Sequence, residues 1–251
     1  MKEVSGDSKI VMGYIYSALF WGVIGLVLGL LISVQMWSVS FNFGEYFSFG
    51  RLRTVHTNVL AYGLGITAEM GAFYFIIGRL TKRSLIFPKL AVFQLIFFNI
   101  VVLVGMLSLF AGYNQSLEYA EFEWFVDLGV VVAWVLFAIN VLGTILTRKE
   151  KHMYVSLWYI IATMVAVAVL YIVNNMHLVA SLGKSYHLFA GLNSANVEWW
   201  YGHNAVGFLF TTPILAIFYY FLPKSTGMPI YSHRLSILAF WSLIFMYLWT
   251  G

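Results

Sequence analysis

Long apolar segments alternate with short polar loops along the whole chain. Each apolar segment approaches the roughly 20 residues that an α-helix needs to cross the hydrocarbon core of a membrane. The segments show neither the alternation of a membrane β-barrel strand nor an internal repeat. The pattern therefore predicts an all-α, polytopic transmembrane helix bundle of about seven helices. The expected segments are 11–36, 57–78, 88–112, 125–147, 153–179, 201–222 and 233–251.

Basic residues are distributed unevenly between the two sets of loops. All but three of the 14 basic residues lie before the first segment or in the loops that follow the second, fourth and sixth segments. The positive-inside rule places these loops, and with them the N-terminus, in the cytoplasm. The opposite face carries most of the acidic residues and the three remaining bases, Arg51, Arg53 and Lys184.

Composition supports an integral membrane protein. Hydrophobic residues make up 61% of the chain and charged residues only 10%, whereas soluble domains carry about 25% charged residues. The first apolar segment is too long for a signal-peptide core, so we expect a retained helix. With no cysteine, disulfides and thiolate ligands are excluded. The net charge of +4 comes from bases in short loops and does not indicate nucleic-acid binding.

Three residues capable of ligation or redox chemistry are expected at one depth, near the outer ends of three different segments. They are His56, His203 and Tyr247. Ionisable residues inside a membrane are costly and are functional candidates by default. The alternative is that these rings only belong to the aromatic belt at the interface, the role we expect for Trp199 and Trp200. Residue type alone leaves the metal open, because imidazole suits haem iron and copper equally well.

Five long motifs follow one another along the chain. They are "FSFGRLRTVHTN", "QSLEYAEFEWFVDL", "YIVNN", "EWWYGHNAVGF" and "YSHRLSILAFWSLIFMYLWTG". These motifs resemble the catalytic subunit of cbb3-type cytochrome c oxidases, the C family of haem–copper oxygen reductases. The resemblance implies that His56 is an axial ligand of a low-spin haem b and that His203 is a ligand of the active-site copper. It implies that Tyr247 is covalently joined to that histidine.

By the same resemblance, the function would be electron transfer from cytochrome c to dioxygen, which is reduced to water with proton pumping. The implied cofactors are a low-spin haem b, a high-spin haem b and copper, with calcium as a further candidate. The implied partners are c-type cytochrome subunits of the oxidase, a soluble or membrane cytochrome c, dioxygen and membrane lipid.

The resemblance also assigns residues around these cofactors. Ser236 and Tyr219 match the family's proton pathway, and Ser236 shares a helix face with Tyr247 by its spacing. Arg51 and Arg53 suit anionic haem propionates, since guanidinium matches a carboxylate well. Glu118 matches a position that the family uses for calcium. The alternative is that it belongs to a solvated acidic loop with Glu121 and Glu123.

The chain also departs from the family pattern. In the family, a His–His pair that completes the copper site follows soon after the position that matches Gly251. Later helices carry the second axial ligand of the low-spin haem and the protein ligand of the high-spin haem. We therefore expect residues 1–251 to form one haem–copper oxidase subunit I domain that is truncated before this pair and inactive alone. His177 is expected to be an interfacial histidine, and His187 a solvated one.

Two other functions remain open at this point. A nitric oxide reductase subunit with haem and non-haem iron is a relative within the superfamily, but it lacks the cross-linked tyrosine, so Tyr247 favours the oxidase. A non-redox membrane transporter often shows internal repeats and helices broken by glycine and proline at mid-membrane. Only four prolines occur here and no repeat is visible, which disfavours a transporter.

Overall fold

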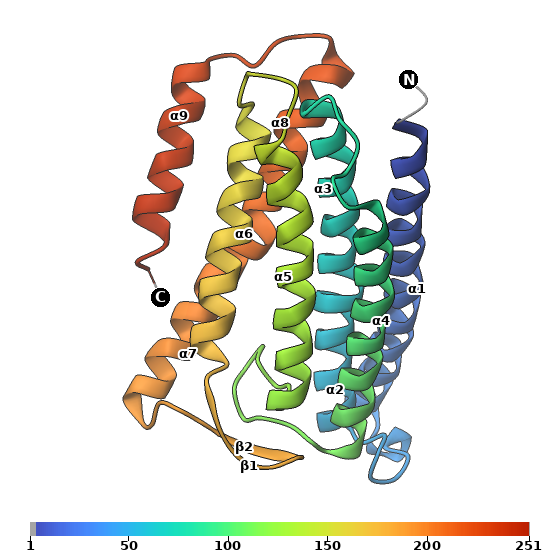
Figure 1. The fold of residues 1–251 in the computed structure, drawn as a ribbon. Coiled ribbons are helices and arrows are strands. Elements are labelled where there is room, and N and C mark those ends of the chain that lie inside the picture. Colours follow the sequence, from blue (N-terminus) through green and yellow to red (C-terminus); the bar gives the residue numbers. More distant parts are fainter. Residues whose placement is uncertain (1–3, 251) are drawn as a thin grey trace.

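The computed structural model describes residues 4–250, and within them helices run side by side along one direction (Figure 1). Six helical spans are long and apolar enough to cross a membrane, and a shorter apolar helix covers His233–Tyr247. The prediction of an all-α membrane bundle of about seven helices is confirmed. The six spans are Asp7–Trp37, Phe49–Leu80, Pro88–Ala111, Trp124–Leu146, Val155–Asn174 and Leu192–Thr226.

Several spans are composite, because short π-helical segments interrupt them. The π segments are Val59–Ile66, Val206–Thr211 and Leu243–Tyr247, and a short 3₁₀ turn covers Val39–Phe41. The α-helices of the described chain are α1 (Val4–Trp37), α2 (Phe49–Asn58), α3 (Thr67–Leu80), α4 (Pro88–Ala111), α5 (Trp124–Leu146), α6 (Val155–Asn174), α7 (Leu192–Ala205), α8 (Thr212–Thr226) and α9 (His233–Ser242).

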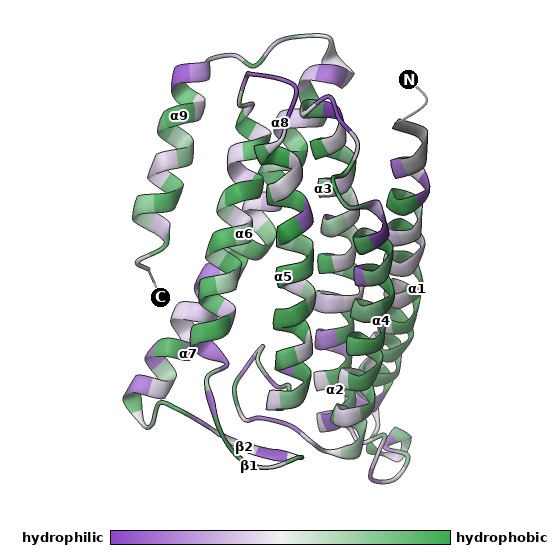
Figure 2. Cartoon of the chain, viewed as in Figure 1, coloured by the Kyte–Doolittle hydropathy of each residue, from purple (hydrophilic) through white to green (hydrophobic). Residues whose placement is uncertain are grey.

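Hydrophobic residues predominate along the helices (Figure 2), and many large apolar side chains are exposed. On α1, Leu19, Val23, Leu26 and Leu30 follow helical spacing and are each more than half exposed. Such a stripe on a water-soluble protein would drive association, but it suits a helix face that contacts lipid.

Glycines and buried polar contacts hold α1 against its neighbours. A Cβ at Gly63 would lie 2.6 Å from the side chain of Trp21, so only glycine allows this approach of α1 to the segment after α2. The hydroxyl of Ser17 and the indole N–H of Trp21 both donate to Asn99 of α4 at 2.8 Å. Small residues and interhelical hydrogen bonds are the usual means of helix association where water is absent.

The loops alternate between the two ends of the bundle, as the charge pattern predicts. At one end, the backbone N–H of Lys149 donates to the carbonyl of Thr81 at 3.0 Å, which joins two of the basic loops. At the other end, the indole N–H of Trp124 donates to the carbonyl of Ser181 at 3.0 Å. The first end is the predicted cytoplasmic end and the second the predicted outer end.

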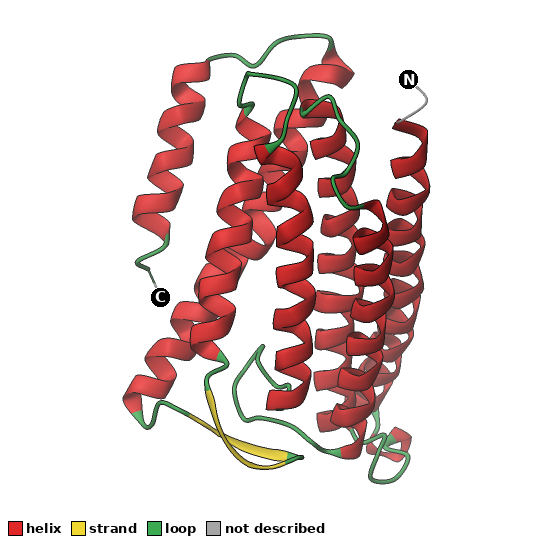
Figure 3. Ribbon diagram, viewed as in Figure 1, coloured by secondary structure: helices red, strands yellow, loops and turns green. Residues whose placement is uncertain are grey.

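The structure corrects the expected segments on the outer side. Helix α6 ends at Asn174, and an antiparallel hairpin of β1 (His177–Ser181) and β2 (Lys184–His187) follows it (Figure 3). Helix α7 begins at Leu192 rather than at 201. Its first turns are polar and carry no apolar signal, because they lie beyond the predicted membrane core.

The topology can be tested with reporter fusions. We expect a reporter after Glu121 to be active only in the periplasm and a reporter after Lys149 only in the cytoplasm. These positions lie in loops at opposite ends of the bundle, and the basic loop is retained inside. The opposite reporter pattern would contradict the orientation.

Candidate functional site

The structure brings His203 and Tyr247 into direct contact. Their ring centroids are 4.4 Å apart with an angle of 20° between the ring planes, and the Tyr247 hydroxyl donates to the backbone carbonyl of His203 at 3.3 Å. His203 lies in α7, and Tyr247 ends the π segment that continues α9. Two residues that are far apart in sequence therefore form one stacked pair.

This stacking depends on Gly207, which lies one turn after His203. A Cβ at this position would collide with Cε1 of Tyr247, so the close approach requires glycine. Two further bonds fasten the C-terminal segment to α7. The indole N–H of Trp200 donates to the carbonyl of Leu248 at 2.9 Å, and the amide of Asn204 donates to the carbonyl of Thr250 at 3.0 Å. Trp200 thus has an interhelical role beyond the aromatic belt.

His203 lies farther along its helix than the sequence suggested. Because α7 begins at Leu192, the histidine is about three turns, or about 17 Å, inside the helix rather than at its mouth. Its Nε2 atom is buried and has no hydrogen-bond partner in the described chain. A buried ring nitrogen without a protein partner fits an imidazole that bonds to a metal or another group.

A cavity of about 650 Å³ lies beside His203, between α7 and the chain that follows His56. Its walls are mostly apolar, which suits a large flat cofactor with few polar groups. The lining includes Thr57, Asn58, Ala61, Tyr62, Trp199, Tyr201, His203 and Phe210.

His56 packs against α1 rather than against His203. Its Nδ1 lies 2.8 Å from the carbonyl oxygen of Gly25, and a Cβ at Gly29 would lie 2.7 Å from its Cε1. A carbonyl only accepts, so Nδ1 carries the proton and Nε2 has a free lone pair. This arrangement fits an axial haem ligand, because a bond from the far nitrogen fixes both tautomer and ring orientation. His56 is not among the residues that line the cavity.

Each of the three predicted residues lies at a π segment. His56 and His203 come one turn before Val59–Ile66 and Val206–Thr211, and Tyr247 ends Leu243–Tyr247. Such segments are rare and occur frequently at functional sites. Nothing in the sequence pattern indicated them.

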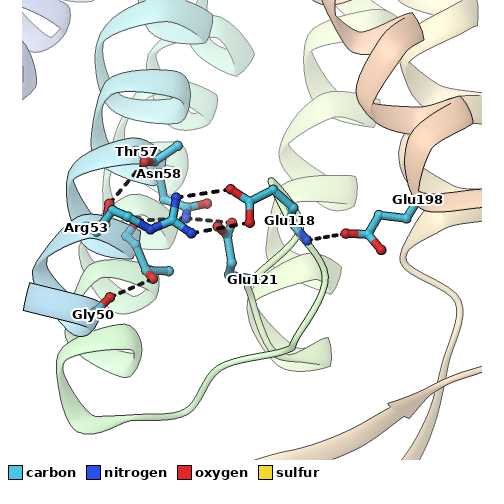
Figure 4. A network of polar contacts seen from close by, with 8 residues as sticks. Gly50, Arg53, Thr57, Asn58, Glu118, Glu121 and Glu198 are labelled. Atoms are coloured by element: carbon cyan, nitrogen blue, oxygen red, sulfur yellow. Dashed lines mark hydrogen bonds and ion pairs between the residues drawn. The ribbon is translucent and has the colours of Figure 1, made fainter. Parts of the chain in front are cut away.

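Arg53 and Glu118, predicted for different roles, form an ion pair with each other (Figure 4). The two guanidinium nitrogens of Arg53 lie 3.1 and 3.3 Å from the two oxygens of Glu118. The backbone N–H of Glu118 donates to Glu198 at 2.6 Å. Arg51 pairs with Glu45 at 2.7 Å and donates to the carbonyl of Phe110 at 2.8 Å.

The acidic loop is not solvated throughout, contrary to the alternative for Glu118. Glu121 is buried and accepts from the Asn58 amide at 3.0 Å, and Glu123 is fully buried. Burial raises the pKa of the Glu121 carboxyl, against the bond from Asn58. Only tertiary contacts distinguish these two residues from those of an ordinary surface loop, so no local sequence pattern could have indicated their burial.

Ser236 and Tyr219 line one cavity of about 610 Å³ at the predicted cytoplasmic end, between α8 and α9. The Ser236 hydroxyl donates to the carbonyl of Ser232 at 3.0 Å, and the ring of Tyr219 stacks on Tyr159 with 5.6 Å between centroids. The structure therefore brings the two predicted pathway residues together. Among the hydrogen bonds of residues 4–250, none joins them to Tyr247.

Fold and site together define a multi-pass helical membrane protein with a stacked histidine–tyrosine pair beside an apolar cavity. The chain belongs to the family of cytochrome c and quinol oxidase polypeptide I, whose model matches residues 9–251.

Relatives of similar sequence are cytochrome oxidase subunits. The chain is 42% identical over 244 residues to the cbb3-type cytochrome c oxidase subunit CcoN1 of Stutzerimonas stutzeri. This alignment covers 97% of this chain and 52% of that protein. It is 38% identical over 257 residues to cytochrome c oxidase subunit 1 of Rhodobacter capsulatus. That alignment covers 100% of this chain and 48% of the relative. The chain spans about half the length of the curated relatives it matches.

The contact at Gly207 can be tested by substitution. We expect Gly207→Ala to destabilise the bundle by about 1–3 kcal/mol, because the new methyl group overlaps the ring of Tyr247. Gly50→Ala is the matched control, since a Cβ there meets nothing within 4 Å and alanine favours a helix. Unfolding in mixed detergent micelles measures both variants. Equal stability of the two would contradict the close stacking.

Proposed function

We propose that this chain forms part of the catalytic core of a cbb3-type terminal oxidase, which passes electrons from cytochrome c to dioxygen with proton pumping. The observation that supports this most is the stacked His203–Tyr247 pair beside the apolar cavity. In this proposal, residues 1–251 belong to one haem–copper oxidase subunit I domain, and the sequence that corresponds to the other half of the relatives supplies the remaining ligands.

Each histidine has a defined task in this proposal. His56 holds the low-spin haem b through Nε2, with Nδ1 held by Gly25. His203 contributes its buried Nε2 atom to the copper site. When bound, the high-spin haem b and copper together supply the electrons and the binding site for dioxygen.

Tyr247 holds a proton at its phenolic oxygen, directed at the carbonyl of His203. Its ring lies against the imidazole, and this proximity supports a covalent link between the two rings.

The charged groups on the outer side suit haem propionates and a cation. In our proposal Arg51 and Arg53 face the propionates, and Glu118 is a candidate calcium ligand, since carboxylate oxygens suit this ion. Arg53 and Glu118 neutralise each other in the structure. Haem and calcium binding would therefore replace one ion pair with two new charge-matched contacts.

Ser236 and Tyr219 are proposed as the cytoplasmic entry of the proton pathway, because both hydroxyls border one cavity and each can donate and accept. The proposed partners are c-type cytochrome subunits, a cytochrome c donor and the surrounding lipid. The family match disfavours a transporter. The requirement for Tyr247 in oxygen reduction distinguishes an oxidase from a nitric oxide reductase.

The role of His56 can be tested in the assembled oxidase. We expect His56→Ala to abolish the low-spin, six-coordinate haem b spectrum, because the change removes one axial ligand. The matched control is His152→Ala, in an exposed loop at the opposite end of the bundle. A parent-like low-spin spectrum in His56→Ala would exclude this ligand.

The role of Tyr247 can be tested in the same complex. We expect Tyr247→Phe to keep both haem spectra and to lower oxygen reduction by at least about 100-fold, because the phenolic proton is lost while the ring is kept. A peptide map should show His203 and Tyr247 on one cross-linked species in the parent only. Parent-like turnover of oxygen in the variant would favour a nitric oxide reductase or another chemistry.

A further inference from the structure

A second group of buried titratable side chains lies at the outer end of the bundle, apart from the site described above. Asp127 is in the first turn of α5, and His177 begins β1. The Tyr171 hydroxyl of α6 donates to Oδ1 of Asp127 at 2.7 Å, and Nδ1 of His177 lies 3.6 Å from Oδ2. The side chains of His177 and Asp127 are 1% and 6% exposed, which corrects the expectation of an interfacial histidine.

This pair is incompletely satisfied. Oδ2 of Asp127 and both ring nitrogens of His177 are buried and have no hydrogen-bond partner in the described chain. Such atoms are costly, and the cost rises when one of them carries a charge. An ionised Asp127 beside a neutral imidazole places one net negative charge in this site. One added proton removes the net charge, whichever residue holds it.

Charged and titratable groups approach the pair from each neighbouring element. Glu123 caps α5 and accepts from Gln115 at 2.9 Å and from Ser185 at 2.7 Å, which also fastens β2 over the site. On β2, His187 lies 6.0 Å from His177 between ring centroids and contacts Ser194 through Nδ1 at 2.7 Å.

The negative charge of Glu198 in α7 favours the protonated form of His187 and so opposes the effect of burial on its pKa. Burial lowers the pKa of His177, the neighbouring His187 lowers it further, and Glu123 opposes both effects. Burial lowers the pKa of His187 as well. The protonated forms of both imidazoles are therefore disfavoured. Each ring suits transient protonation during a proton transfer.

Tyrosine hydroxyls join this pair to the cavity beside His203. The ring of Tyr171 lies 6.4 Å from Tyr62 and 6.4 Å from Tyr201, between centroids. The three tyrosines also line one small pocket in common. Tyr62 and Tyr201 line the same cavity as His203. Each phenolic hydroxyl can donate and accept, as a relay of protons requires.

We propose that Asp127 and His177 form a proton-holding site beneath the β1–β2 hairpin, connected to the cavity at His203 through Tyr171 and Tyr62. In one transfer, the Asp127 carboxylate accepts the proton of the Tyr171 hydroxyl, and Tyr171 takes a proton from Tyr62. Tyr62 regains a proton from a protonated water molecule in the cavity beside His203. Asp127 then gives its proton to Nδ1 of His177. No electron moves in these steps, and the net result is one proton carried toward the outer face.

The role of this relay in proton export rests on the proposed oxidase function, but the holding of a proton does not. The first experiment therefore uses the chain alone in lipid nanodiscs. Infrared difference spectra are recorded while pH is varied from about 5 to about 9, a range that spans the ordinary pKa of histidine. We expect a protonated-carboxyl band that disappears in Asp127→Asn and whose midpoint moves by at least one pH unit in His177→Gln.

Two further variants keep the test decisive. Tyr171→Phe removes only a hydroxyl and should also shift the midpoint, whereas His152→Gln should leave it unchanged because His152 is exposed at the opposite end. Thermal unfolding verifies that each variant is folded. Two results would overturn the proposal. One is the absence of a band assignable to Asp127, and the other is a band whose midpoint changes in neither His177→Gln nor Tyr171→Phe.

The second experiment uses the assembled oxidase in vesicles. We expect Asp127→Asn to retain haem spectra and oxygen consumption while the protons released per electron fall by about half or more. A parent-like ratio, or loss of the haem spectra, would refute the relay, since Asp127 would then be idle or only structural. Absence of oxygen reduction in the parent complex would instead refute the proposed function and leave the nanodisc result standing.

Discussion

The exclusion of water from the bilayer interior is the constraint on which the rest of the structure depends. Lipid offers no hydrogen-bond partners, so the backbone closes into helices and polar side chains find partners on neighbouring helices. Tyr14 with the carbonyl of Ala91, and Trp21 with Asn99, are such contacts. His56 follows the same rule when its ring nitrogen bonds to Gly25. The fixed ring orientation of His56 is thus a consequence of the absence of water.

Positions without side chains set the geometry of the candidate site. Gly29 leaves space for the imidazole of His56, and Gly207 leaves space for the ring of Tyr247. In both cases the functional ring occupies the volume that a Cβ would take. The rings are therefore placed by backbone-to-ring contact, which has little freedom, rather than by contact between two flexible side chains.

Apolar periodicity and loop charge were sufficient to predict the bundle and the number of helices, because the membrane imposes both signals directly. They failed where tertiary contacts decide. The polar first turns of α7 carry no apolar signal, so its start at Leu192 was missed. The burial of Glu123 and His177 depends on a hairpin that no local sequence pattern predicted. The contact of His203 with Tyr247 was anticipated from family resemblance rather than from spacing.

The hydrogen bond between His56 and Gly25 also has an electrical consequence. A ligating imidazole that donates its far N–H becomes more electron-rich, and a more basic ligand favours ferric over ferrous iron. With haem bound as proposed, the spacing between α1 and α2 would set the reduction potential of that haem. A small displacement of α1, even one caused by lipid on its outer face, would then alter the driving force for electron transfer without touching the iron.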